Sequence, residues 1–118
     1  SVSAREMCFI ENGLGYRDSC GARISDLGLL RQVIDGVYAD FNLDLRFRCK
    51  GKGKIILQFE TEGGLSVIEE AVLDVNDNEY TLRSLKATAP VGTRQVTVIV
   101  TSVYGGELFA DEFVLNIN

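Results

Sequence analysis

The side chains best suited to binding chemistry are five cations at alternate positions in mid-chain: Arg46, Arg48, Lys50, Lys52 and Lys54. Side chains of an extended strand alternate between its two faces, so these cations form a basic ridge on one face. The ridge is predicted to contact an anion, which is a phosphate, an acidic glycan or an acidic protein partner. The alternative is a solvated face, or a charged edge that blocks pairing between sheets.

Acidic residues dominate the segment that follows the ridge, from Glu60 to Glu79. If glycine turns place these two charged segments at opposite ends of the molecule, copies can pack head to tail, with charge complementarity choosing the register. Self-assembly or another protein partner is therefore expected.

One acidic stretch, Asp74 to Asn78, matches the first half of an EF-hand calcium loop. Glu79 then stands where the loop requires glycine, and Leu85 where it requires a bidentate glutamate, so an EF-hand is excluded. The stretch is predicted to be an ordinary Asn/Asp-rich turn or a weaker calcium site.

Residues for catalysis are scarce, and the chain is predicted not to be an enzyme. It has no histidine, the commonest general base. The carboxylate pairs Glu69-Glu70 and Asp111-Glu112 are sequence neighbours, so on a strand they point to opposite faces. No nucleophile elbow, phosphate-binding loop or dinucleotide fingerprint occurs.

Composition predicts one globular domain spanning residues 1–118. The chain is 46% hydrophobic and 25% charged, and no segment approaches the roughly 20 consecutive apolar residues of a membrane span. Its net charge of −5 argues against nucleic-acid binding, which depends on many cations against phosphate. Neither a membrane nor a nucleic acid is an expected partner.

The three cysteines, Cys8, Cys20 and Cys49, include no C-x-x-C pair and are too few for a structural zinc site. Cys49 falls on the apolar side of a strand and is predicted to be a buried thiol. A bridge between Cys8 and Cys20 stays open, as does the alternative that both are free.

Turn signals about every ten residues divide the chain into short strands, which predicts an antiparallel β-sandwich of eight or nine strands. The clearest alternation runs from Phe41 to Cys49, and the last two strands are predicted to form a hairpin around Gly105-Gly106. In the last strand Phe109, Asp111, Phe113, Leu115 and Ile117 are expected to share a face. The expected strands are Met7–Ile10, Cys20–Ser25, Leu29–Ile34, Phe41–Cys49, Ile55–Phe59, Val67–Val75, Tyr80–Thr88, Gln95–Thr101 and Glu107–Ile117.

The carboxyl-terminal half resembles a carbohydrate-binding-module-type jelly roll, one of the galactose-binding-like β-sandwiches. The matching features are the aromatic-led segment Tyr80 to Thr88, the proline turn Ala89 to Thr93, the valine strand Val96 to Val100 and the last strand from Asp111 to Leu115. Asn12-Gly13 matches a further turn, so the resemblance covers most of the chain. It implies an all-β, antiparallel sandwich of jelly-roll type.

The resemblance also implies site residues. It makes Asp111 a candidate ligand of a structural calcium ion, although Leu14-Gly15-Tyr16 replaces the acidic partner; the alternative is an aspartate bonded to backbone. Such modules stack aromatic rings on sugars, and this chain has no tryptophan. Tyr38 and Tyr104, beside glycine turns, are the candidate glycan contacts, whereas Tyr80 matches a core position. No cofactor other than calcium is expected.

The resulting hypothesis is a non-enzymatic structural or binding β-sandwich, namely a surface or decoration protein of a phage particle that assembles through protein contacts. The amino terminus shows no secretory signal, and Ser1 fits a trimmed initiator methionine, so synthesis in the host cytoplasm and a place on the virion surface are expected. The alternative is a glycan-binding module of a larger secreted carbohydrate-active enzyme.

Overall fold

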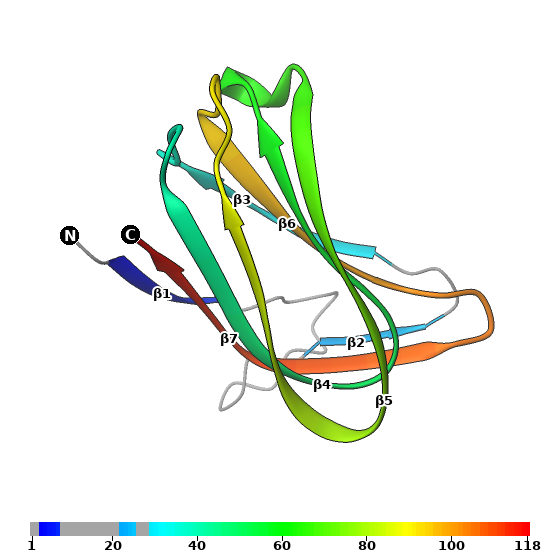
Figure 1. The fold of residues 1–118 in the computed structure, drawn as a ribbon. Helices are drawn as coiled ribbons and strands as arrows, with labels where there is room; N and C mark the ends of the chain where they lie inside the picture. Colours follow the sequence, from blue (N-terminus) through cyan, green and yellow to red (C-terminus); the bar gives the residue numbers. More distant parts are fainter. Residues whose placement is uncertain (1–2, 8–21, 26–28) are drawn as a thin grey trace.

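A computed structural model describes residues 3–7, 22–25 and 29–118 of the chain (Figure 1). These residues are almost entirely strand, and no helix among them is long and apolar enough to cross a membrane. The elements are β1 (Ser3–Met7), β2 (Ala22–Ser25), β3 (Leu29–Asp35), β4 (Asn42–Glu60), the short 3-10 helix η1 (Glu62–Gly64), β5 (Val67–Thr88), β6 (Gln95–Ser102) and β7 (Glu107–Ile117).

Two long strands, β4 and β5, form a bent hairpin that passes through both layers of the sandwich (Figure 1). The first half of β4 pairs with β7, and its second half pairs with β6. β6 carries β3 on its other edge, and β7 carries β1 and β2. All pairs are antiparallel, so one continuous sheet is folded into two layers that face each other. This confirms the predicted all-β, antiparallel sandwich.

The bend in β4 depends on two glycines, Gly51 and Gly53. Gly51 has φ +102, and a Cβ built there would lie 2.0 Å from the carbonyl oxygen of Glu107. A Cβ at Gly53 would lie 2.2 Å from the carbonyl oxygen of Thr101. β4 therefore exchanges β7 for β6 at a point where neighbouring backbone leaves no room for a side chain.

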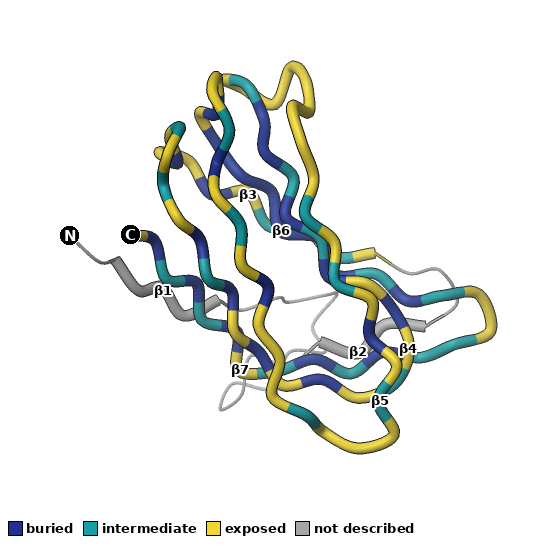
Figure 2. The backbone as a smooth tube through the Cα atoms, in the orientation of Figure 1, coloured by how far each residue is buried: buried dark blue, intermediate teal, exposed yellow. Residues whose placement is uncertain are grey.

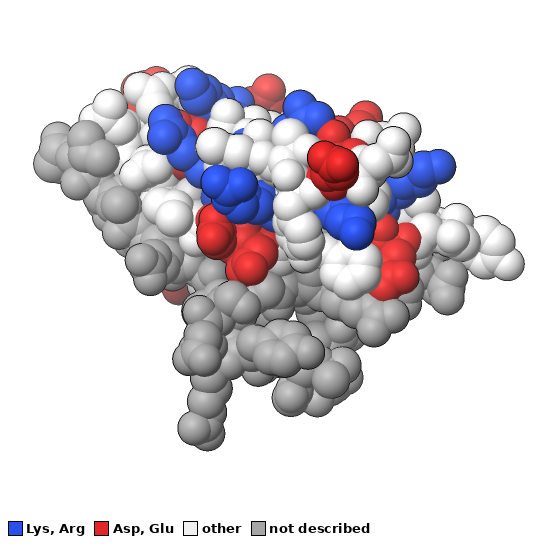
Figure 3. Space-filling model, turned by 90° about the horizontal axis from the view of Figure 1, so that it is seen from below, with Lys and Arg blue, Asp and Glu red and all other residues white. Residues whose placement is uncertain are grey.

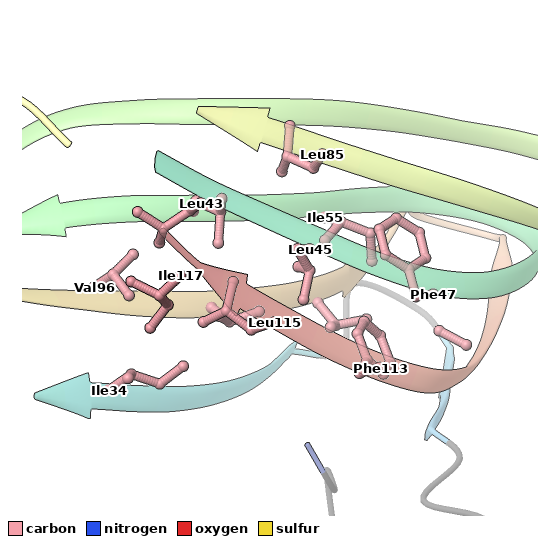
Figure 4. Packing of buried hydrophobic residues seen from close by; sticks show 14 of the residues in the cluster. Ile34, Leu43, Leu45, Phe47, Ile55, Leu85, Val96, Phe113, Leu115 and Ile117 are labelled. Carbon is pink, nitrogen blue, oxygen red and sulfur yellow. The ribbon is translucent and has the colours of Figure 1, made fainter. Parts of the chain in front are cut away.

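The core lies between the two layers and is filled by inward-facing residues of β4, β6 and β7 (Figure 4). Phe47 and Phe113 are each at most 1% exposed, and their rings stack with centroids 5.3 Å apart. Figure 2 shows β6 almost wholly buried, while most of β5 is exposed. The predicted alternation of Phe41 to Cys49 is confirmed, with Leu43, Leu45, Phe47 and Cys49 buried.

A β-bulge in β7 changes the face that its side chains occupy. The register against β4 shifts between the pairs Arg46–Val114 and Arg48–Asp111, and Glu112 has φ +55. Leu108 and Ala110 before the bulge are therefore buried together with Phe113 after it. The expectation that Phe109 and Asp111 share the face of Phe113 is wrong, because one extra residue reverses the alternation.

Three other predictions about the strands need correction. The described residues contain seven strands, not eight or nine, because Gly51 to Gly53 and Asn76 to Asn78 are bends inside β4 and β5 and not turns. The last two strands do not form a hairpin: β6 and β7 both pair with β4, in different layers, and the turn at Gly105 connects the layers. The first strand begins at Ser3 and not at Met7, and its predicted continuation over residues 8–10 lies outside the described residues.

Candidate functional site

An open depression lies on the outer face of the layer that contains β7, the first half of β4 and the second half of β5. Its volume is about 670 Å³. Antiparallel pairing sets side chains of the three strands in rows across the sheet; in one row Asp44 of β4 stands between Lys86 of β5 and Asn116 of β7. The lining residues are Asn42, Leu43, Asp44, Arg46, Lys86, Ala87, Thr88, Asn116 and Asn118, and we call this surface the polar depression.

Hydrogen bonds hold several of its polar groups in place. Asp44 Oδ2 accepts from Arg46 Nε at 3.1 Å, and Asn42 Oδ1 accepts from Thr88 Oγ1 at 2.9 Å. The second carboxylate oxygen of Asp44, Oδ1, is buried and has no hydrogen-bond partner among the described residues. A buried acceptor without a partner is costly, so Asp44 Oδ1 is a polar atom that the described residues leave unsatisfied beside the depression.

The basic ridge lies on the outward face of β4, as predicted, and all five of its cations are exposed. Carboxylates pair with three of them: Arg46 with Asp44 at 3.1 Å, Arg48 with Glu112 at 2.9 Å and Lys54 with Asp74 at 4.0 Å. Figure 3 shows this arrangement as basic side chains spread over the face with acidic side chains between them. The bend of β4 places Arg46, Arg48 and Lys50 on one layer and Lys54 on the other.

The two candidate glycan tyrosines lie far apart. Tyr38 is 45% exposed in the loop after β3, and Tyr104 is 84% exposed in the turn between β6 and β7. These loops lie at opposite ends of β6, so the two rings cannot belong to one binding site (Figure 1). Neither lines the polar depression.

Tyr38 borders a smaller pocket of about 410 Å³, whose other lining residues are Asp35, Gly36, Glu62, Gly63, Arg94 and Gln95. The guanidinium of Arg94 lies 5.5 Å from the centre of the Tyr38 ring, and Phe41 meets the ring edge-on at 5.7 Å. Arg94 thus covers one face of the ring by a cation–π contact, which removes that face as a platform for a sugar.

Asp111 is half-buried beside the β7 bulge, where its Oδ1 accepts the backbone N–H of Glu112 at 2.7 Å. Tyr80 is 52% exposed, so the expectation that it belongs to the core is wrong. Partial burial, and after it the charge of Asp111, raises the pKa of Tyr80. The described residues hold no group of three His, Cys, Asp or Glu side chains arranged to bind a metal ion. Calcium at Asp111 stays a prediction.

Cys49 is a buried free thiol, as predicted, and it lies beside an ion pair at the bend of the hairpin. Its Sγ lies 3.5 Å from Asp77 Oδ2, and Asp77 in turn pairs with Arg83 at 2.5 Å. The hydrogen bonds from Arg83 hold the pKa of Asp77 below its usual value. Burial, followed by the hydrogen bond and the charge of Asp77, raises the pKa of Cys49 to about 12. A bridge between Cys8 and Cys20 lies outside the described residues.

We expect Cys49 to resist alkylation in the folded protein. Thiolate is the reactive form, and a pKa of about 12 leaves almost none of it at pH 8. Iodoacetamide at pH 8, followed by mass spectrometry of the peptide that contains Cys49, should show labelling in denaturant and almost none without it. Rapid labelling of Cys49 in the native protein would contradict the burial of this thiol.

The sequence alone singled out only Arg46 among the residues of the polar depression. Asn42 and Asp44 were on the expected wet face of their strand, which was an available signal. Lys86, Thr88, Asn116 and Asn118 carried no such signal, because their place beside Asp44 follows from the register of β5 and β7 against β4.

The described fold is that of carbohydrate-binding-module-type β-sandwiches. Neither a protein-family model nor a curated protein matches the chain. Among solved structures, a family 4 carbohydrate-binding module matches with a TM-score of 0.59 and 15% identity over 98% of this chain and 78% of that one. A mutant of a family 29 carbohydrate-binding module matches with a TM-score of 0.59 and 13% identity over 98% of this chain and 92% of that one.

A third solved structure, the enzymatically active domain of tailspike protein 4 of bacteriophage CBA120, matches with a TM-score of 0.65. Identity is 16%, and the match covers 99% of this chain. This chain spans only 18% of the length of the tailspike chain. At such low identities the three likenesses establish the fold of this chain and leave its activity to the argument from its site.

Proposed function

We propose that this chain is a non-catalytic glycan-binding module whose ligand lies in the polar depression. The observation that carries the proposal is the set of amide, carboxylate, guanidinium, ammonium and hydroxyl side chains that three adjacent strands present on one open surface. Sugar hydroxyls both donate and accept hydrogen bonds, and this set supplies both kinds of partner. Because paired strands fix the backbone that carries these groups, only their side chains have to be ordered on binding.

The same surface argues against glycoside hydrolysis. Hydrolysis of a glycosidic bond commonly requires two carboxyl groups on either side of the scissile bond. Asp44 is the one Asp or Glu side chain in the described lining of the polar depression, and the chain has no histidine to serve as a general acid. The depression can therefore hold a sugar chain but lacks the groups that would cleave it.

Replacing Asp44 by alanine should weaken glycan binding at least tenfold while the protein stays folded. The Asp44 side chain is 23% exposed and holds Arg46, which also lines the depression, and hydrogen bonds to charged groups contribute about 1.5–3 kcal/mol. Isothermal titration against a panel of neutral and acidic oligosaccharides would measure the effect, with the wild type defining the ligand.

The matched control is Gln58→Ala. Gln58 is also an outward-facing residue of β4 that bonds a carboxylate, with its Nε2 2.8 Å from Glu70 Oε1, but it lies on the other layer. We expect the control to bind like the wild type. If no oligosaccharide binds the wild type, or if Asp44→Ala binds as tightly, the polar depression is not a glycan site.

The second candidate function is a surface or decoration protein of a phage particle that assembles through protein contacts. The likeness to part of a phage tailspike favours it. Light scattering after size exclusion would test it: a defined oligomer that is indifferent to oligosaccharides would support assembly, whereas a monomer that binds one glycan would support the binding module. The place of the protein on a virion or outside a cell depends on the same result.

A further inference from the structure

Positive charge is concentrated on the outward face of β4 and its neighbour β5. The whole chain has 12 Lys and Arg residues and a net charge of −5. The five cations of the basic ridge and Lys86 account for half of these cations, and two of the six, Arg46 and Lys86, line the polar depression. A chain that is acidic overall therefore carries at least half of its cations along two neighbouring strands.

This excess is only partly neutralised within the protein. Arg46, Arg48 and Lys54 have carboxylate partners. Among the described residues no ion pair involves Lys50, Lys52 or Lys86. The guanidinium of Arg46 uses its Nε toward Asp44, and its side chain is 58% exposed, so further donors face solvent. Three ammonium groups and this guanidinium are thus available to an anionic ligand.

We propose that the glycan bound by this module is acidic, with uronate carboxylates that meet these cations. The inference rests on the proposed function. It adds the class of the ligand and the direction in which the bound sugar chain runs across the protein. The sugar chain starts in the polar depression at Lys86 and Arg46 and continues along β4 toward Lys50 and Lys52. Arg46 and Lys50 are four residues apart on a strand, which is about 13 Å, so a short oligosaccharide reaches both.

The electrostatics fit an acidic ligand in two respects. A row of exposed cations attracts a polyanion before contact and speeds its encounter with the site. Because the cations are exposed, salt screens them, with a Debye length of about 10 Å at 0.1 M. Binding should therefore weaken steadily as NaCl is raised from low concentration, which a neutral glycan bound by hydrogen bonds alone would not show.

The first experiment compares acidic hexasaccharides with neutral forms of the same sugars. Oligomers of galacturonate, alginate and hyaluronate are titrated against the wild type, each beside its carboxyl-reduced counterpart. We expect at least one acidic oligomer to bind, and its reduced form to bind at least tenfold more weakly. Equal or tighter binding of neutral oligosaccharides would overturn the acidic assignment and leave the glycan-binding function standing. Binding of no oligosaccharide would overturn both.

The second experiment uses the double variant Lys50→Gln with Lys52→Gln, which lies outside the polar depression. We expect it to bind the acidic oligomer about fivefold more weakly and with less dependence on salt, because exposed ion pairs contribute modestly. The control is Arg31→Gln with Arg94→Gln, which removes the same charge from exposed positions on β3 and before β6. An equal loss in both double variants would show an effect of net charge alone and would overturn the proposed path along β4.

Discussion

Replacing Gly51 by alanine should destabilise the protein by about 2–5 kcal/mol. A positive φ lowers the stability of the fold by about 1–2 kcal/mol when the residue has a side chain. Overpacking lowers it by about 1–3 kcal/mol more. Both apply here, since Gly51 has φ +102 and its new Cβ would meet the carbonyl oxygen of Glu107 at 2.0 Å. Urea denaturation followed by circular dichroism would measure the free energy of unfolding.

Gly105→Ala is the matched control for this prediction. Gly105 also has positive φ, +70, but nothing lies within 4 Å of a Cβ built there. The Gly105→Ala variant should therefore lose only the stability that a positive φ costs, about 1–2 kcal/mol. Equal losses in the two variants would mean that β7 does not pass as close to the bend of β4 as the structure places it.

Truncating Phe113 to alanine should cost about 3–5 kcal/mol, the usual range for a large buried aromatic side chain. Its ring is 1% exposed and stacks on Phe47 in the middle of the core. Thermal and urea unfolding of the variant would give the loss of stability, and a cavity left beside Phe47 is its physical cause.

Phe109→Ala tests the bulge that lies between the two phenylalanines. Phe109 is only half-buried, and it pairs with Lys50 on the outward face of the layer. We expect a loss of about 1 kcal/mol for Phe109, typical of a side chain outside the core. A loss as large as that of Phe113 would place both rings in the core, and the reversal of faces at Glu112 would then be wrong.

Much of the fold could be predicted from alternation and turn chemistry. β3, β6 and β7 begin at the predicted residues, and the wet and buried faces of the first half of β4 are those predicted. The bends at Gly51 to Gly53 and at Asn76 to Asn78 were mistaken for turns. Glycine and Asn/Asp-rich stretches end strands in most contexts, and a continuing strand has the same residues when a neighbouring backbone crosses it closely.

The pairing of the last two strands could not be predicted from their sequence. A double glycine between two alternating segments is the usual mark of a hairpin, yet β6 and β7 lie in different layers. Both strands form hydrogen bonds with β4, which is long enough to pair with β7 in one layer and with β6 in the other. The choice between a hairpin and a connection across the layers therefore depended on β4, whose paired residues lie 35 or more positions earlier in the chain.

The candidate site also has one part that the sequence predicted and one part that it did not. The alternate cations from Arg46 to Lys54 could be placed on one face from the sequence, because the period of a strand requires it. The polar depression could not be found, since Lys86 and Asn116 stand beside Asp44 only through the registers of β5 and β7. The prediction that Tyr38 and Tyr104 contact a glycan stays untested, and the structure separates the two residues.

By itself the sequence determined the class of fold, the core face of β4, the basic ridge and the buried thiol of Cys49, all of which follow from residue type and the two-residue period of a strand. Only the tertiary structure decided where strands bend, which partners they choose and which polar groups meet. The physical reason is that strand pairing forms hydrogen bonds between residues distant in the chain, and a shift of one residue, as at Glu112, moves every later side chain to the other face.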